Sequence, residues 1–172
     1  SGLGPIVKFV AEYVDNPVLI TNSDRRLIAA SWPKKVSKPK GIASYLQSAV
    51  DGSVLVDEVE ESINEQLQGA DKDLDNDLHR ARAYQKTIMV DGQSVGLMRI
   101  LEVRSIVNRD DIQFVEYASS LAAFELSKDI AVKEERMRLQ GDFVIDLVGG
   151  RVEPKTFETL AQNAGWDPKP GY

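Results

Sequence analysis

The stretch AYQKTIMVDGQSVGLMRILEV, residues 83–103, decides the fold of this chain. Two runs rich in β-branched residues, 83–90 and 94–103, flank Asp91-Gly92. An Asp-Gly pair tolerates positive φ and favours a tight hairpin turn. Side chains alternate along a strand, so one face of the first run carries Tyr84, Lys86, Ile88 and Val90. We therefore expect an antiparallel hairpin, in which Gly96 marks a bulge, a close neighbour or room for a ligand.

The N-terminal segment predicts a helix followed by two more strands. Apolar residues recur with helical spacing as far as Val14, and the residues before Pro17 end the helix because that position avoids the helical region. Residues 18–21 and 25–31 are typical strands around a polar turn. A lysine-rich loop (34–40), a short helix (41–50) and a short strand (54–56) should follow. The chain therefore belongs to the α+β class.

A long helix is expected from Asp110 to Val148. Asn108 or Arg109 caps it, and Asp110 and Asp111 occupy the first turn, where the helix dipole favours acidic side chains. A continuous helix would span about 58 Å. Its second half carries a seam with the spacing of a coiled coil, made of Leu126, Ile130, Lys133, Met137, Gln140, Val144 and Leu147. The apolar members of this seam predict a dimer interface with a second copy.

The composition excludes several classes of function. The chain has 172 residues, 42% of them hydrophobic, and its net charge of -6 disfavours generic nucleic-acid binding. It has no cysteine, which excludes disulfides, zinc-thiolate sites and cysteine nucleophiles and suits a reducing cytoplasm. No apolar run approaches the roughly 20 residues needed to span a bilayer. We predict a cytoplasmic protein that neither enters a membrane nor requires a cofactor.

Three segments carry a family resemblance. They are 16–31; 90–102 with 110 and 116–126; and ERMRLQGDFVIDL at 135–147 with Gly165-Trp166-Asp167, the most specific of the three. Together they resemble the upstream half of PucR/CdaR-type bacterial transcriptional regulators. The resemblance implies a GAF-like sensory domain over 1–126, a helical linker or dimerisation helix over 127–150, and the truncated start of a degenerate GGDEF-like domain over 151–172. It implies an antiparallel sheet with helices on one face, a ligand cavity under loops on the other, and DNA binding by a missing downstream domain.

The segment from His79 to Tyr84 is the main candidate ligand site. It combines the only histidine with Arg80, Arg82 and an aromatic ring at the entry to a strand. Arginine offers a fork of donors and tyrosine a stacking face, so the group suits a carboxylate or a flat heterocycle. Alternatively, the arginines simply balance the acidic segment 57–77, which carries nine acidic residues and one lysine.

Three further residues complete the predicted ligand site. Trp32 and Tyr45 flank the lysine loop and line an apolar cavity, unless they are ordinary core aromatics. Met98 is included with them, although methionines such as Met89 and Met98 usually fill the core. Residues 71–82 resemble a calcium loop but have Asn76 and Arg82 where glycine and glutamate belong, so no metal site is predicted.

Catalytic motifs are missing from the sequence. It contains no Gly-rich phosphate loop, no Gly-x-Ser-x-Gly elbow and no His-Glu-x-x-His pair. The leading interpretation is a non-enzymatic sensory module that binds a small organic effector between the sheet and segment 34–84, dimerises, and signals through its long helix. A ligand-free dimerisation scaffold is the alternative, and an enzyme using paired carboxylates is the third.

Overall fold

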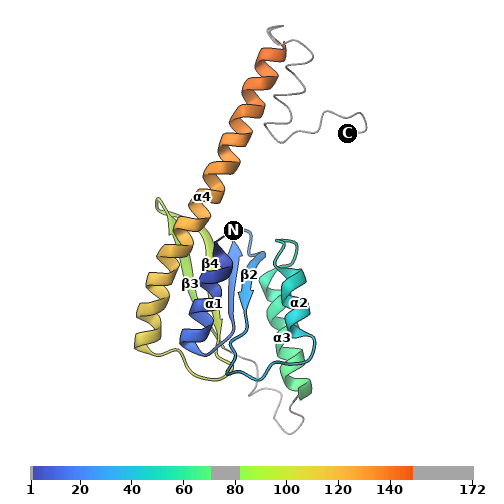
Figure 1. Ribbon diagram of the computed structural model, residues 1–172, viewed down its shortest axis with the longest axis vertical. Helices are drawn as coiled ribbons and strands as arrows, with labels where there is room; N and C mark the ends of the chain where they lie inside the picture. Colours follow the sequence, from blue (N-terminus) through green and yellow to red (C-terminus); the bar gives the residue numbers. More distant parts are fainter. Residues whose placement is uncertain (1, 71–81, 149–172) are drawn as a thin grey trace. The chain divides into compact units, whose positions relative to one another are not determined.

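The computed structural model describes residues 2–70 and 82–148. Their elements are α1 (Leu3–Val14), β1 (Val18–Asn22), β2 (Leu27–Ser31), α2 (Ile42–Ala49), α3 (Val56–Ala70), β3 (Ala83–Val90), β4 (Gln93–Leu101) and α4 (Arg109–Val148) (Figure 1). The chain divides into two units, 1–126 and 127–172, and the whole sheet lies in the first. The predicted α+β class, with an antiparallel sheet, flanking helices and a long C-terminal helix, is confirmed.

The sheet has the strand order β2-β1-β4-β3, and every neighbouring pair is antiparallel. The predicted hairpin between β3 and β4 is confirmed. Asp91 and Gly92 have φ values of 50° and 79°, and Val90 pairs with Gln93 across the turn. Two successive residues with positive φ match the right-handed twist of the strands that they join. The order places β1 and β4 in the centre and leaves β2 at one edge.

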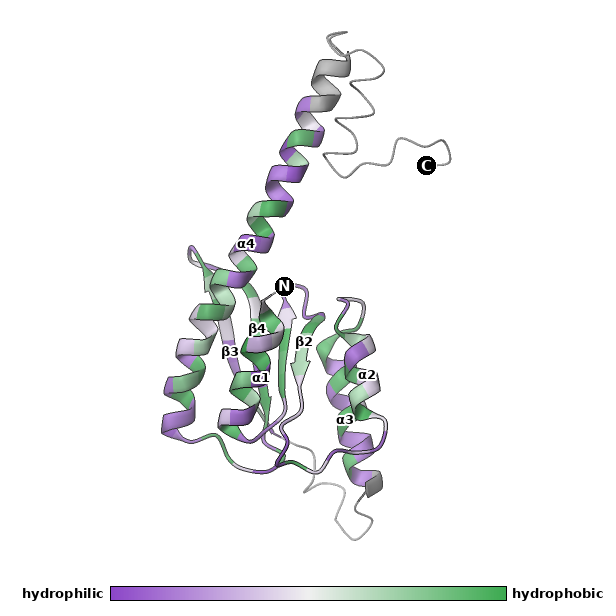
Figure 2. Cartoon of the chain, in the orientation of Figure 1, coloured by the Kyte–Doolittle hydropathy of each residue, from purple (hydrophilic) through white to green (hydrophobic). Residues whose placement is uncertain are grey.

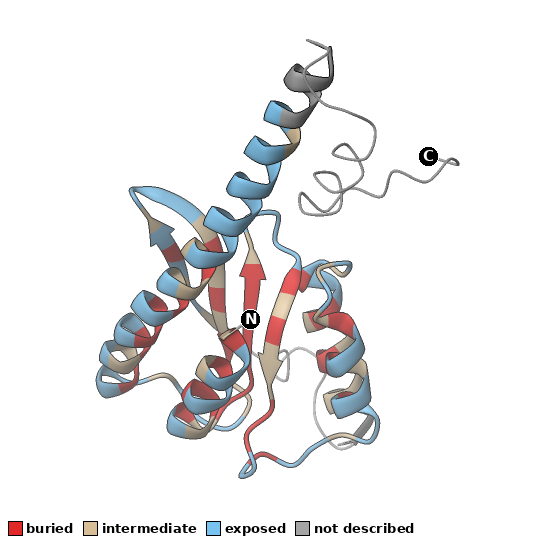
Figure 3. Cartoon of the chain, turned by 45° about the horizontal axis from the view of Figure 1, so that its top comes forward, coloured by how far each residue is buried: buried red, intermediate tan, exposed pale blue. Residues whose placement is uncertain are grey.

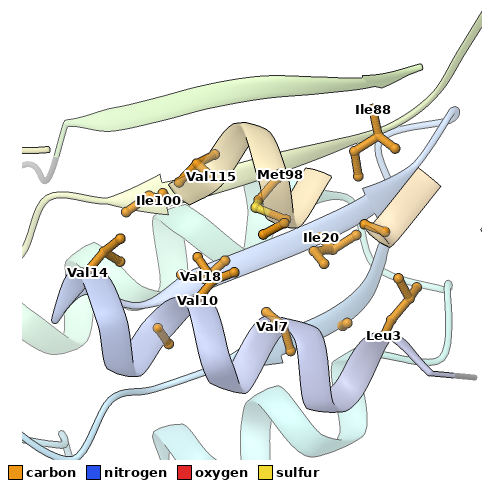
Figure 4. Packing of buried hydrophobic residues seen from close by; sticks show 14 of the residues in the cluster. Leu3, Val7, Val10, Val14, Val18, Ile20, Ile88, Met98, Ile100 and Val115 are labelled. Atoms are coloured by element: carbon orange, nitrogen blue, oxygen red, sulfur yellow. The ribbon is translucent and has the colours of Figure 1, made fainter. Parts of the chain in front are cut away.

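One face of the sheet packs against α1 and the first part of α4. In Figure 4, Val7 and Val10 of α1 lie over Val18 and Ile20 of β1, with Met98 of β4 beside them. These side chains are buried because the apolar residues of α1 recur every three or four positions and so share one face. We call this set the α1/α4 cluster; its buried members are Leu3, Val7, Val10, Ala11, Val14, Val18, Ile20, Ala29, Ile88, Met98, Ile100, Val115, Ala118, Ala122 and Leu126.

The other face carries a second cluster, under α2 and α3, so the expectation of helices on one face and loops on the other is wrong. Figures 2 and 3 show hydrophobic, buried residues on the sides of these helices that turn toward the sheet. Strand alternation explains the division, since Leu19 points to this face while Val18 and Ile20 point to the first. We call this set the α2/α3 cluster; its buried members are Leu19, Leu27, Trp32, Val36, Ile42, Leu46, Ala49, Val56, Val59, Ile63 and Leu101.

The short strand predicted at 54–56 is wrong. Only Leu55 forms a bridge, to Arg26, and Val56 already begins α3. The backbone N–H of Val56 donates to the Arg25 carbonyl oxygen at 2.8 Å, which anchors the helix start beside β2. Helical spacing from Val56 onward buries an apolar stripe in the α2/α3 cluster, and acidic residues in the first turn favour the positive end of the helix dipole.

The long helix begins and continues as predicted. The backbone N–H of Asp111 donates to Asn108 Oδ1 at 2.8 Å, and the backbone N–H of Asn108 donates to Asp111 Oδ2 at 3.1 Å. This reciprocal pair satisfies donors that a helix start otherwise leaves unpaired. From Arg109 the helix runs for 40 residues, to Val148.

Asn16 ties the end of α1 to the loop that precedes α4. It is fully buried, and its Nδ2 donates to the Ser105 carbonyl oxygen at 2.9 Å. Its Oδ1 accepts from the backbone N–H groups of Arg104 at 3.0 Å and Ser105 at 3.3 Å. The predicted helix end at residues 15–17 is confirmed, because α1 stops at Val14.

Candidate functional site

A cleft of about 490 Å³ lies along the edge strand β2, between the start of α1 and one side of α2. Its volume falls within the range of small-molecule sites, about 300–1,000 Å³. Its lining also has the composition of such sites, mostly apolar with a few polar groups. The lining residues are Gly4, Ile28, Ala29, Ala30, Ser31, Trp32, Lys38, Ala43, Leu46, Gln47 and Val50.

The cleft is hollow because small residues meet there. Gly4 of α1, Ala30 of β2 and Ala43 of α2 come from three segments that are distant in sequence, and none has a side chain beyond Cβ. Larger side chains, such as Leu46, form the wall behind them. Gly41 allows α2 to start at this place, because its φ of 86° is left-handed and suits glycine.

Trp32 forms one wall of the cleft and also fixes the loop beyond it. Its ring is buried, and Nε1 donates to the Val36 carbonyl oxygen at 3.1 Å. The polar end of the indole is therefore already paired, so the ring offers an apolar surface to a ligand. Lys38 is exposed and is the only ionisable side chain among the described lining residues. The cleft thus suits a compact apolar molecule that carries an anionic group near Lys38.

Of the residues predicted to bind ligand, Trp32 lies in this cleft and the others described lie elsewhere. Tyr45 packs partly against the α2/α3 cluster, whereas Tyr84 packs against the α1/α4 cluster on the opposite face. Met98 is fully buried in that same cluster, and Arg82 is exposed. The structure therefore does not bring these four together with Trp32.

Several residues named in the predictions lie outside the part of the chain that the structure describes. They are His79 and Arg80, residues 71–81 of the calcium-like loop, and segment 151–172.

The expectation that both methionines fill the core is confirmed for Met98 and wrong for Met89, which is 48% exposed because it points to the other face from its buried neighbour Ile88.

Most residues that line the cleft were not predicted from the sequence. Lys38 stood out only as part of a lysine-rich loop, a pattern that usually indicates a solvated surface. Gly4, Ala30 and Gln47 give no signal of their own in the sequence. A row of small residues at a sheet edge becomes recognisable only when the neighbouring helix positions are known.

A polar group on the α3 side of the sheet was also missed. Arg99 Nε donates to Glu60 Oε1 at 2.7 Å, and Arg99 Nη1 donates to Gln85 Oε1. Both charged side chains are mostly buried. Since the guanidinium already has a carboxylate partner, this group serves as a link between α3 and the β3–β4 hairpin rather than as an obvious anion site.

The described groups with clear pKa shifts do not line the cleft. Hydrogen bonds from the Ser53 side chain and backbone lower the pKa of Asp51, in the turn after α2. A hydrogen bond from Arg138 lowers the pKa of Glu135 on α4. Among the described residues there is no group of three or more His, Cys, Asp or Glu side chains that could hold a metal ion. The described helices include none long and apolar enough to cross a membrane.

The residues predicted for the dimer seam differ in their surroundings. Leu126 is buried in the α1/α4 cluster of its own chain. Ile130 and Met137 are exposed, while the side chains of Val144 and Leu147 lie outside the described part of the structure. The seam therefore starts, at Leu126, with a residue that already belongs to the core of the first unit.

No protein-family model matches the chain, and no curated protein matches it significantly.

Proposed function

We propose that this chain is the effector-sensing and dimerisation module of a cytoplasmic bacterial transcriptional regulator with a GAF-like sensory domain. The observation that carries the proposal is the cleft formed by α1, β2 and α2. Its size, its apolar walls and the single cation at Lys38 favour a small organic acid as effector. A lining with one ionisable side chain offers no acid–base pair, which favours binding over catalysis.

The position of α1 suggests how binding is transmitted. Gly4, at its N-terminal end, lines the cleft, while Val7 and Val10 share the α1/α4 cluster with Val115 of α4. An effector that favours one position of α1 thereby favours one packing of α4 against it. A ligand shifts a conformational equilibrium only through such differential contacts. In the proposed regulator, α4 carries the change toward a DNA-binding domain, and the chain makes no DNA contact itself.

Ala43→Phe, which fills the cleft, tests the proposal. Wild-type protein is screened by thermal shift against organic acids, amino acids and purines, and then measured by calorimetry with the best compound. At a ligand concentration of 100 times Kd, binding should stabilise the protein by about 2.7 kcal/mol. Ala43→Phe should abolish this gain, whereas Ser44→Phe, on an exposed position of α2 that does not line the cleft, should retain it.

Lys38→Gln tests whether the effector carries an anionic group. It should weaken binding of a carboxylate by up to about fivefold and leave binding of the matching amide nearly unchanged. A compound that binds Ala43→Phe as tightly as wild type would place the effector elsewhere. If no compound stabilises the wild-type protein, the ligand-free dimerisation scaffold becomes the better interpretation.

A further inference from the structure

Aromatic side chains gather on the outer side of α1 and α4. The ring of Phe114 stacks on Tyr13 with a centroid distance of 3.9 Å and lies 5.5 Å from the ring of Phe9. Further along α4, Tyr117, Leu121 and Phe124 follow Phe114 at spacings of three and four residues, so they share its side of the helix. We call this surface the aromatic face; it consists of Phe9, Tyr13, Phe114, Tyr117, Leu121 and Phe124.

The exposed area of the aromatic face lies near the upper end of the range for the largest apolar patch of a monomer. At about 200 Å² for a fully exposed side chain of this kind, roughly 550 Å² remains exposed on Phe9 (67%), Tyr13 (49%), Tyr117 (64%), Leu121 (42%) and Phe124 (62%). The largest apolar patch of a typical monomer measures about 300–600 Å². Phe114 packs partly against the α1/α4 cluster, but the buried core residues of α4 lie on the opposite side of the helix.

We infer that the aromatic face is where a second copy of this chain docks. Two copies of the face meeting around a twofold axis would cover at most roughly 1,100 Å², slightly less than the 1,200–2,000 Å² of a standard stable interface, so the inferred dimer also needs contacts from side chains at the rim. The adjoining helix positions Gln113 and Ser120 are uncharged. Interface centres are rich in tyrosine and phenylalanine and poor in charge, as this face is.

A membrane surface fits the face less well than a second copy does. Helices that lie on anionic lipid place lysine and arginine beside their aromatic residues. Here Glu12 of α1 and Glu116 of α4 stand close in sequence to the aromatic residues, and the chain carries a net charge of -6. A second copy presents the same uncharged aromatic side chains, whereas anionic lipid presents negative charge over its whole surface.

The inference does not depend on an effector, and it places dimer contacts in the first unit rather than along the seam beyond Leu126.

The test variant replaces Phe9, Tyr117 and Phe124 by serine. These side chains are exposed, so the fold should survive, as circular dichroism can verify. In sedimentation experiments the wild-type protein should be a dimer, and the variant should dissociate at least tenfold more readily toward the 19.1 kDa monomer. Met89→Ser, an exposed apolar position on β3, is the matched control and should stay dimeric.

Two outcomes would overturn the inference. One is a wild-type protein that remains monomeric at 100 μM, and the other is a folded triple variant that dimerises like wild type. If Ile130→Glu with Met137→Glu alone gives monomers, the seam is the interface and the aromatic face is not. The seam pair thus separates this inference from the dimer contact predicted from sequence.

Cross-linking tests the same point without disturbing the face. The chain has no cysteine, so a single introduced cysteine reports one position. Ser120→Cys, beside Tyr117 and Leu121 on α4, should give a covalent dimer with a short bismaleimide. Ser48→Cys, exposed on α2, should give at most a tenth of that yield. Equal yields from the two positions would contradict docking at the aromatic face.

Discussion

Replacing Gly96 with alanine should separate the two central strands of the sheet. Gly96 lies in β4, opposite Asn22 of β1 and Ile88 of β3. A Cβ at this position would overlap the main-chain carbonyl oxygen of Thr21 and lie 3.5 Å from Leu126 Cδ1. Because the Thr21 oxygen belongs to the backbone of a buried strand, it cannot rotate away as a side chain would. Restoring van der Waals distance requires a shift on the order of 1 Å. Of the roles that sequence suggested for this glycine, the structure shows the close neighbour and also a register shift beside it, because Ile88 pairs with Gly96 and Met89 with Ser94.

The expected cost is about 3 kcal/mol, the upper part of the range for overpacked cores. For a chain of this size, that loss lowers Tm by about 6–12 °C. Urea unfolding followed by circular dichroism gives the change in unfolding free energy directly. Gly4→Ala is the matched control: its Cβ meets nothing within 4 Å, and it lies in α1, so stability should rise by about 0.5 kcal/mol. A Gly96→Ala protein with the urea midpoint of wild type would refute the close approach of β1 and β4.

Three further substitutions test the packing through urea midpoints. Asn108→Ala removes the reciprocal cap with Asp111 and should cost about 1 kcal/mol. Asn16→Ala leaves two part-buried backbone N–H groups without their acceptor and should cost about 1–2 kcal/mol. Glu60→Ala leaves the mostly buried guanidinium of Arg99 without its carboxylate and should cost about 2 kcal/mol, of which the double change with Arg99→Leu should restore more than half.

The parts of the fold that sequence predicts are those with local signals. The Asp91-Gly92 turn and the cap at Asn108 each depend on a few adjacent residues, so their chemistry is visible without knowledge of the rest. The start of α3 is different. Val54, Leu55 and Val56 favour a strand by propensity, yet burial of an apolar helical stripe against the sheet decides the outcome, and tertiary packing of this kind overrides a weak local preference.

The cleft is harder to predict than any single element. It depends on small side chains from α1, β2 and α2 meeting at one edge, and a small residue has the same appearance in sequence wherever it lies. The predicted cluster of ligand residues shows the converse error. Tyr84 and Trp32 are both aromatic residues near the expected cavity, but strand alternation and the sheet itself place them in separate clusters on opposite faces. The type of a residue does not show on which face of the sheet its side chain lies.

The apolar stripe of α4 is buried in one part of the helix and exposed in another, although its spacing stays the same. One stripe of apolar residues runs from Val115 through Leu126 to Met137. In the first unit that stripe is buried in the α1/α4 cluster, whereas Met137, in the second unit, is exposed. Tyr117 and Phe124 lie on the opposite side of the helix. Both belong to the first unit, and both side chains are exposed. The two stripes lie on opposite sides of α4, so contact with the α4 helix of one second copy cannot bury both of them. Since the core of the first unit already buries Leu126, the inferred second copy would meet the aromatic side of α4.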